Sequence, residues 1–216
     1  MSELSRMLNQ CRKPAGETGK LVADEMNISH YELTSWGLEK IDIKPDSIIL
    51  DIGCGGGRTV NRLALLAPKG KVFGIDYSND CVNWSIEFNK ELIDSGKVEI
   101  HNASVEKIPF EDNKFDLALA VETIYFWPNL LENFSEIRRV LKPSGRIMII
   151  NEIYTSPNFK DRNDEYARAG NLKIHTPQEL VEFLKRTGYV NIQTHLIENK
   201  NWMCCIGEKD RPLKFP

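Results

Sequence analysis

Four glycines fall within five residues of this chain, in the stretch Gly53-Cys54-Gly55-Gly56-Gly57. An apolar run, SIILDI (47–52), comes directly before them, and a segment with helical spacing, RTVNRLALLA (58–67), comes directly after them. A buried strand, a glycine loop and a helix in this order are typical of the first unit of an open α/β sheet. Because glycine allows positive φ and close backbone approach, the loop is predicted to hold a ligand at the helix N-terminus.

The rest of the chain continues this alternation of apolar runs and helical patterns. Further strands are predicted at 71–76, 97–103, 115–121 and 146–152, with two antiparallel strands near 190–198 and 201–208. The helices between them are predicted at 79–94, 129–141 and 177–188. The pattern predicts an α/β fold with a doubly wound, mostly parallel, seven-stranded sheet and a late hairpin at one edge.

The first 46 residues have a different character, with three predicted helices (2–10, 17–27 and 29–41) and no strand. Ser29 and Glu32 have the spacing of a capping box at the start of the third helix. A segment of this length is too short to fold alone, so residues 1–46 are expected to form a helical lid or cover, with a hinge between Gly16 and Gly19. Residues 47–216 are expected to form the ligand-binding domain of a single globular unit. The charged run at 160–170 is expected to be a solvated segment.

The composition excludes several classes of partner. The formal net charge is −3, so no basic field is expected to hold a nucleic acid. No apolar run approaches the roughly 18 residues that a membrane span needs. The five cysteines include no C-x-x-C pair, which favours reduced thiols in the cytoplasm over disulfides or a zinc site. No metal site, nucleic-acid partner or membrane span is therefore expected. The protein is expected to be cytoplasmic.

The spacing of the glycine loop separates the candidate ligands. A dinucleotide fingerprint needs a small residue at the position of Arg58, and a P-loop needs a Lys-Ser or Lys-Thr pair that is absent. Asp51 at the entrance of the loop disfavours phosphate and suits an ammonium group. A ligand that carries both an amine and a carboxylate fits a loop built on Gly53, Gly55 and Gly57.

The second predicted strand ends at Asp76, nineteen residues after Gly57. A carboxylate at this position can accept hydrogen bonds from the two vicinal hydroxyls of a ribose. The neighbouring Tyr77 can lie against a flat base. A ligand with a base, a ribose and an amino-acid end is S-adenosylmethionine.

Four segments in this order resemble the motifs of class I S-adenosylmethionine-dependent methyltransferases, closest to the small-molecule group that includes quinone-biosynthesis C-methyltransferases. The segments are LDIGCGGGRT (50–59), VFGIDYS (72–78), NASVEKIPFEDNKFDLALAVE (102–122) and RVLKPSGRIMI (139–149). The resemblance implies that Asp76 binds the ribose and that Val105 gives its backbone N–H to the base. Ser104 stands where many members have an acidic adenine contact. Val121, at the end of the fourth strand, is also expected at the cofactor.

The resemblance implies methyl transfer to a small-molecule acceptor, with S-adenosylhomocysteine as the product. Where the acceptor must lose a proton, His30 and Glu122 are the candidate bases, although a surface histidine and a solvated loop carboxylate are equally compatible with the sequence. The N/D-P-P-Y/F and Pro-Cys motifs of nucleic-acid methyltransferases are absent. The alternatives are a non-catalytic module that binds S-adenosylmethionine or S-adenosylhomocysteine, a protein methyltransferase, and an NAD-dependent oxidoreductase, which Arg58 opposes.

Overall fold

The computed structural model describes residues 2–211 and places the strands of this part of the chain in one sheet. The sheet order is β3-β2-β1-β4-β5-β7-β6, with β7 antiparallel to both of its neighbours and β1 to β5 parallel. The strands are Ile48–Ile52 (β1), Lys71–Asp76 (β2), Val98–Asn102 (β3), Phe115–Val121 (β4), Leu141–Asn151 (β5), Tyr189–Ile197 (β6) and Trp202–Lys209 (β7). The predicted doubly wound sheet with a late hairpin is confirmed.

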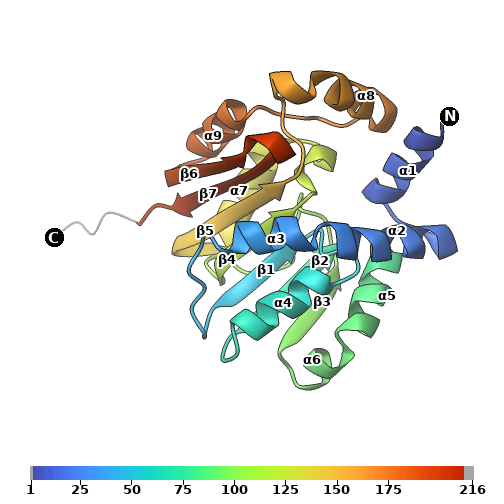
Figure 1. The fold of residues 1–216 in the computed structure, drawn as a ribbon. Helices are drawn as coiled ribbons and strands as arrows, with labels where there is room; N and C mark the ends of the chain where they lie inside the picture. The colour runs from blue at the N-terminus through green and yellow to red at the C-terminus, as the bar shows by residue number, and fades with distance from the viewer. Residues whose placement is uncertain (1, 212–216) are drawn as a thin grey trace.

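Helices cover both faces of this sheet (Figure 1). On one face lie α3, α4 and α5, and the other face packs against α7 and α9 through buried side chains such as Phe134 and Leu180. The α-helices are Glu3–Arg12 (α1), Gly16–Ser29 (α2), Tyr31–Leu38 (α3), Arg58–Leu66 (α4), Asn79–Phe88 (α5), Lys90–Asp94 (α6), Leu130–Val140 (α7), Lys160–Gly170 (α8) and Pro177–Arg186 (α9). Short 3-10 helices lie at Ile124–Phe126, Pro157–Phe159 and Glu198–Lys200. Within residues 2–211, no helix combines the length and the apolar composition needed to cross a membrane.

The sheet order reverses between β1 and β4, which are neighbours although β2 and β3 separate them in sequence. At such a switch point the connections after the two strands diverge to opposite sides and leave a crevice at the carboxyl edge. The glycine loop follows β1, and Glu122 follows β4. The fold therefore brings these two segments to the same crevice.

Two predicted elements differ from the structure for reasons that lie in side-chain contacts. The helix expected over 79–94 is interrupted at Asn89, whose Nδ2 donates hydrogen bonds of 3.0 Å to the carbonyl oxygens of Gly57 and Ser85. The run 160–170, expected to be a solvated segment, is the helix α8, in which Asn163 is buried and donates 2.8 Å to the carbonyl of Tyr154.

The N-terminal segment divides into two parts. In α3, Leu33 is fully buried, and the α-carbon of Gly37 packs so closely on Ile150 that an added Cβ would lie 2.4 Å from its Cδ1. In contrast α1 and α2 lie beyond the edge of the sheet, near α8 and α5 (Figure 1). Leu21, on α2, is 66% exposed. Only α1 and α2 therefore have the position of a lid, and α3 belongs to the core.

Candidate functional site

The glycine loop adopts backbone conformations that require glycine at the predicted positions. Gly53, Gly55 and Gly57 have φ of 75°, 51° and 85°. A Cβ on Gly53 would lie 2.4 Å from Cγ2 of Thr123, so the loop packs tightly on the segment after β4. On the other side, no atom of the described residues lies within 4 Å of the Cβ position of Gly55. The backbone at Gly55 is thus open to a ligand.

Asp51 is buried without a partner for its charge. The side chain is 2% exposed, and its Oδ2 atom has no hydrogen-bond partner within residues 2–211. Burial, with a smaller contribution from the nearby Asp76, raises the pKa of Asp51 to about 8. Since a buried carboxylate is costly unless it is paired, this atom marks a position that an ammonium group can satisfy.

Asp76 ties the end of β2 to the glycine loop. Its Oδ2 accepts a 3.0 Å hydrogen bond from the backbone N–H of Gly55, and its Oδ1 accepts one of 2.9 Å from the N–H of Ser78. Each carboxylate oxygen can accept a further bond. The carboxylate is therefore fixed in orientation and retains the acceptor capacity that two ribose hydroxyls would use.

Two of the other predicted contacts to the adenosine, Tyr77 and Ser104, already form hydrogen bonds within the chain. The hydroxyl of Tyr77 donates to the carbonyl of Arg12, and that of Ser78 donates to the carbonyl of Pro14 at 2.9 Å. The hydroxyl of Ser104 donates a 3.1 Å hydrogen bond to a carboxylate oxygen of Glu106. Residues 12–14, which join α1 to α2, thus lie against the end of β2.

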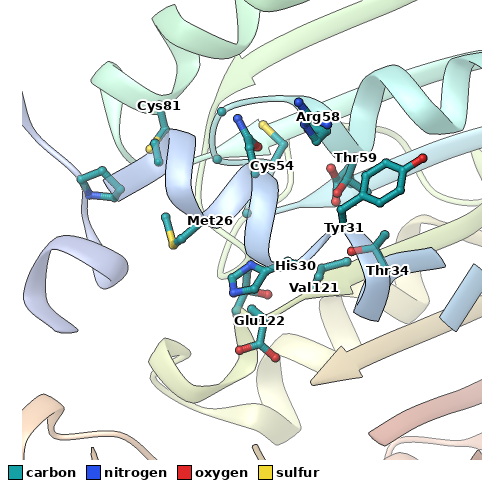
Figure 2. A pocket seen from close by; sticks show the side chains of 18 of the residues that line it. Met26, His30, Tyr31, Thr34, Cys54, Arg58, Thr59, Cys81, Val121 and Glu122 are labelled. Atoms are coloured by element: carbon teal, nitrogen blue, oxygen red, sulfur yellow. The ribbon is translucent and has the colours of Figure 1, made fainter. Parts of the chain in front are cut away.

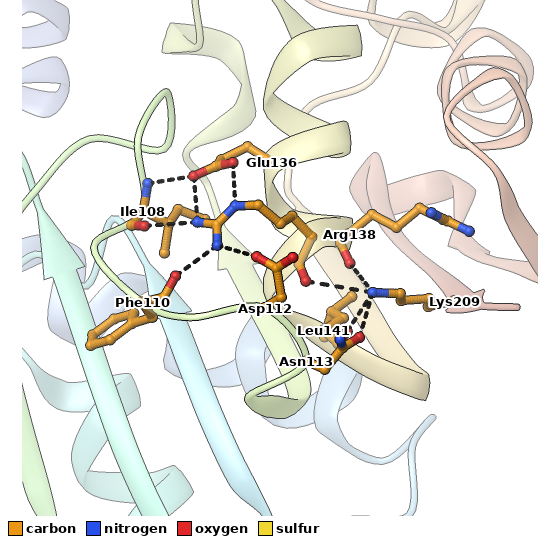
Figure 3. Close-up of polar contacts among 9 residues, drawn as sticks. Ile108, Phe110, Asp112, Asn113, Glu136, Arg138, Leu141 and Lys209 are labelled. Carbon is orange, nitrogen blue, oxygen red and sulfur yellow. Dashed lines mark hydrogen bonds and ion pairs between the residues drawn. The ribbon is translucent and has the colours of Figure 1, made fainter. Parts of the chain in front are cut away.

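An arginine fixes the loop that follows β3 and begins with Ser104 and Val105. The Arg139 guanidinium of α7 donates to the carbonyl oxygens of Ile108 and Phe110 at 2.9 and 2.7 Å. Figure 3 labels these two residues together with Glu136 and Asp112. The guanidinium also pairs with Glu136 and Asp112 at 2.8 Å each. Val105 is 7% exposed, and its side chain packs in the core.

One cavity joins the loop to the candidate bases (Figure 2). It holds about 90 Å³ and brings together Asp51, Gly53, Gly55, Val121, Glu122 and His30 of the predicted residues. Gly57, Asp76, Tyr77, Ser104 and Val105 do not line it. The helices α2 and α3 form one wall, with side chains that the sequence did not single out: Met26, Asn27, Tyr31 and Thr34.

Two arginines at the start of α4 line the cavity. The Nε atom of Arg58 is buried and has no hydrogen-bond partner within residues 2–211, and its guanidinium lies 5.9 Å from the ring centre of Tyr31. Arg62 packs closer, at 4.3 Å from the same ring, and donates to the backbone carbonyl of Tyr31. Arg58 therefore offers a cation to an anionic group beside the N-terminus of α4.

His30 and Glu122 line the other end of the cavity, and Glu152 lies beside them. Oε1 of Glu122 accepts hydrogen bonds from the Tyr125 hydroxyl at 3.0 Å and from the backbone N–H of Glu152. Nε2 of His30 lies 3.8 Å from Oε1 of Glu152. Burial, reinforced by Glu152, raises the pKa of Glu122 well above its usual range, and burial lowers the pKa of His30.

The surroundings of this cluster differ from the sequence-based expectation in two respects. Ser29 does not cap a helix: it is the last residue of α2, and His30 joins α2 to α3. Glu152 was not predicted as a site residue. It follows β5, and only the pairing of β4 with β5, in which Val121 is opposite Ile150, places it beside Glu122.

The switch point, the glycine loop and the unpartnered Asp51 lie together at a Rossmann-like site. A family model described as a methyltransferase domain matches residues 43–205. The chain belongs to this family of class I S-adenosylmethionine-dependent methyltransferases. The cofactor of the family is S-adenosylmethionine, and its product is S-adenosylhomocysteine.

Individual relatives agree with this assignment. The chain is 34% identical over 142 residues to 24-methylenesterol C-methyltransferase 2 of Arabidopsis thaliana. The matched stretch covers 64% of this chain and 39% of that protein. It is 29% identical over 133 residues to demethylmenaquinone methyltransferase of Bacillus mycoides (strain KBAB4), covering 59% and 56%. The structure of Haemonchus contortus phosphoethanolamine N-methyltransferase 2 with S-adenosylmethionine has the same fold, with a TM-score of 0.79 at 18% identity and coverage of 98% and 61%. The chain spans less than two thirds of each of these proteins.

Proposed function

We propose that this chain transfers a methyl group from S-adenosylmethionine to a small-molecule acceptor. The observation that carries the proposal is the buried, unpartnered Asp51 beside the open face of Gly55, in the same cavity as Glu122 and His30. A module that only binds the cofactor does not need the second end of this cavity. An NAD-dependent oxidoreductase is disfavoured because Arg58 replaces the small third residue of the dinucleotide loop.

The geometry supports one orientation of the cofactor. Its ammonium group pairs with Asp51, and its carboxylate lies toward Arg58 and the N-terminus of α4. The ribose hydroxyls bind Asp76, with the base near Tyr77, Ser104 and the backbone of Val105. The methyl group then faces Val121 and Glu122, where the acceptor enters.

The protein contributes to methyl transfer mainly by positioning the acceptor and by excluding water from the site. Displacement at a sulfonium is in line, so fixing the acceptor against the methyl carbon removes much of the entropic barrier. The cofactor loses its positive charge in the transition state, which a site closed to water favours. For an acceptor that must lose a proton, we propose that the proton is lost at the cluster of His30 and Glu122.

The names of the relatives support a small-molecule acceptor. They include methyltransferases of sterols, demethylmenaquinone and phosphoethanolamine. All five cysteines are free, which supports a reducing compartment such as the cytoplasm.

We also propose that α1 and α2 form a lid over the cofactor. The cavity of about 90 Å³ is far smaller than the roughly 300–1,000 Å³ of small-molecule pockets, so part of its wall must move when the cofactor enters. The connection at residues 12–14 covers the Asp76 edge. Gly16, with φ of 62°, begins α2 and can act as the hinge, whereas Gly19 is buried within that helix.

The proposal is tested by incubating the purified protein with methyl-labelled S-adenosylmethionine and fractions of a metabolite extract. We expect label to appear in a small-molecule product, and much less of it with Asp76→Ala at a cofactor concentration that does not saturate the variant. If S-adenosylhomocysteine binds and no fraction accepts label, the chain is a binding module. Label on protein alone would favour a protein methyltransferase.

A further inference from the structure

We propose that His30, Glu122 and Glu152 form a binding site for a divalent transition-metal ion at the acceptor end of the cavity. The role of the ion in catalysis rests on the proposed function. The binding of the ion does not, and it can be measured separately.

The three side chains form a compact set of ligand atoms. Each offers one nitrogen or carboxylate oxygen, and these atoms all lie within 4.8 Å of one another. Two ligands on opposite sides of one ion are about 4.2 Å apart, because Zn–N and Zn–O distances are about 2.0–2.2 Å. Small side-chain rotations therefore bring all three atoms into one coordination sphere.

Three separate segments build the site, and the fold fixes two of them. Glu122 and Glu152 follow the paired parallel strands β4 and β5. His30 comes from the junction of α2 and α3, and Figure 2 shows its ring above Glu122. The third ligand thus belongs to the helical segment over the sheet, and a bound ion would link that segment to the strand ends.

Neither glutamate of the cluster has a lysine or arginine as its ion-pair partner within residues 2–211. His30 is the ion-pair partner of Glu152. Arg162 is near enough to influence Glu122, but its guanidinium donates to the side chains of Asn163 and Asn201. Two close carboxylates in a partly dry site repel each other, and a divalent cation removes this cost.

The surrounding contacts orient the proposed ligands. Tyr125 donates to Oε1 of Glu122, and its hydroxyl oxygen accepts a 3.2 Å hydrogen bond from the backbone N–H of Ile153. Such outer contacts fix a ligating carboxylate. One imidazole and two carboxylates suit Mn²⁺, Fe²⁺, Co²⁺ or Zn²⁺ better than the all-oxygen sites that Ca²⁺ and Mg²⁺ prefer.

Three protein ligands leave coordination positions for the acceptor. A hydroxyl group bound there becomes more acidic and releases its proton to water. The resulting oxyanion attacks the methyl carbon: the O–CH₃ bond forms as the S–CH₃ bond breaks, and its electron pair stays on sulfur in S-adenosylhomocysteine. The structure thus favours a hydroxylated acceptor whose oxygen can bind a metal ion. His30 and Glu122 then act as ligands and not as bases.

The test is a titration of the EDTA-treated chain, residues 1–216, with Mn²⁺, in which the electron paramagnetic resonance signal of the free ion reports binding. We expect one ion per chain. Glu152→Gln, chosen because this side chain is 41% exposed and tolerates the change, should weaken binding about 10- to 100-fold. The matched control Glu182→Gln, at an exposed position of α9, should bind as the unchanged protein does.

Binding of S-adenosylhomocysteine is measured on the same samples. Retained cofactor binding with no Mn²⁺ or Zn²⁺ bound, or equal metal affinity in both variants, would overturn the metal site and leave His30 and Glu122 as candidate bases. If the protein without substitutions does not bind S-adenosylhomocysteine, that result would instead count against the proposed function.

Discussion

The backbone N–H of Gly55 donates a 3.0 Å hydrogen bond to Oδ2 of Asp76, which joins the glycine loop after β1 to the end of β2. One carboxylate thereby holds the loop and keeps further lone pairs for the ribose contacts proposed above. The two parts of the expected site, one for the amino-acid end and one for the ribose, are coupled through this side chain.

Replacing Asp76 should therefore weaken cofactor binding. Asp76→Ala removes two charge-assisted bonds to the ribose, and the affinity for S-adenosylhomocysteine should fall by about ten- to a few hundred-fold in calorimetry. Asp94→Ala, at an exposed carboxylate on α6, is the matched control. Circular dichroism should be native in both. Equal affinity in the two variants would remove Asp76 from the site.

Ligand selectivity distinguishes the methyltransferase from a dinucleotide enzyme. S-adenosylmethionine and S-adenosylhomocysteine should raise the melting temperature, and NADH should not. The reason is that Arg58 occupies the position where a dinucleotide-binding loop has a small residue. A ligand at ~100 times its dissociation constant adds about 2.7 kcal/mol to the free energy of unfolding. A shift with NADH alone, measured by differential scanning fluorimetry, would contradict the assignment of the cofactor.

The pKa of Asp51 predicts how cofactor affinity depends on pH. With its pKa near 8, Asp51 is mostly protonated in the free protein at neutral pH, whereas the ammonium group of the ligand favours the carboxylate. Affinity for S-adenosylhomocysteine should therefore rise between pH 6 and 8, by up to about tenfold per pH unit, with release of a proton. Calorimetry in buffers of different ionisation enthalpy detects that proton. Asp51→Asn should bind more weakly and lose this pH dependence.

The same shift has the opposite consequence for the free protein. The folded state holds the Asp51 proton more tightly than the unfolded chain, so in the range between the ordinary pKa and about 8 the folded state binds more protons. The contribution of Asp51 to the free energy of unfolding is therefore greatest at low pH and decreases as pH rises through this range. The raised pKa of Glu122 acts in the same direction. In urea denaturation, the free energy of unfolding of Asp51→Asn should decrease less with rising pH than that of the unchanged protein.

Arg139 should stabilise the loop after β3. Arg139→Ala removes its hydrogen bonds to Ile108 and Phe110 and its pairs with Glu136 and Asp112, and we expect a loss of about 2 kcal/mol in urea denaturation. Arg168→Ala, at an exposed position of α8, is the control and should change stability by less than about 0.5 kcal/mol. A similar small change in Arg139→Ala would mean that the loop holds its conformation without the arginine.

What the sequence could predict followed from local pattern. The buried strands and the start of a helix at residue 177 are encoded within a few residues, and both are confirmed. The break at Asn89 depends on a bond to Gly57, 32 residues away, and the role of Glu152 depends on which strands pair. The junction at His30 depends on how α2 and α3 pack. Features set by such distant contacts leave no periodic signal in the chain.

The contact between Tyr77 and Arg12 gives a test of the lid. Tyr77→Phe keeps the ring that can lie against the base but removes the hydrogen bond from the hydroxyl to the carbonyl of Arg12. One such bond contributes about 1 kcal/mol, so opening of residues 12–29 should become about fivefold more favourable. Hydrogen exchange of α2 in the free protein should be faster by that factor, and association of S-adenosylhomocysteine in stopped flow should also be faster. Helix α3, which is part of the core, should exchange as before and is the internal control. If α2 exchanges at the same rate in both proteins, with and without the ligand, then α1 and α2 are a static cover and the cofactor enters by another route.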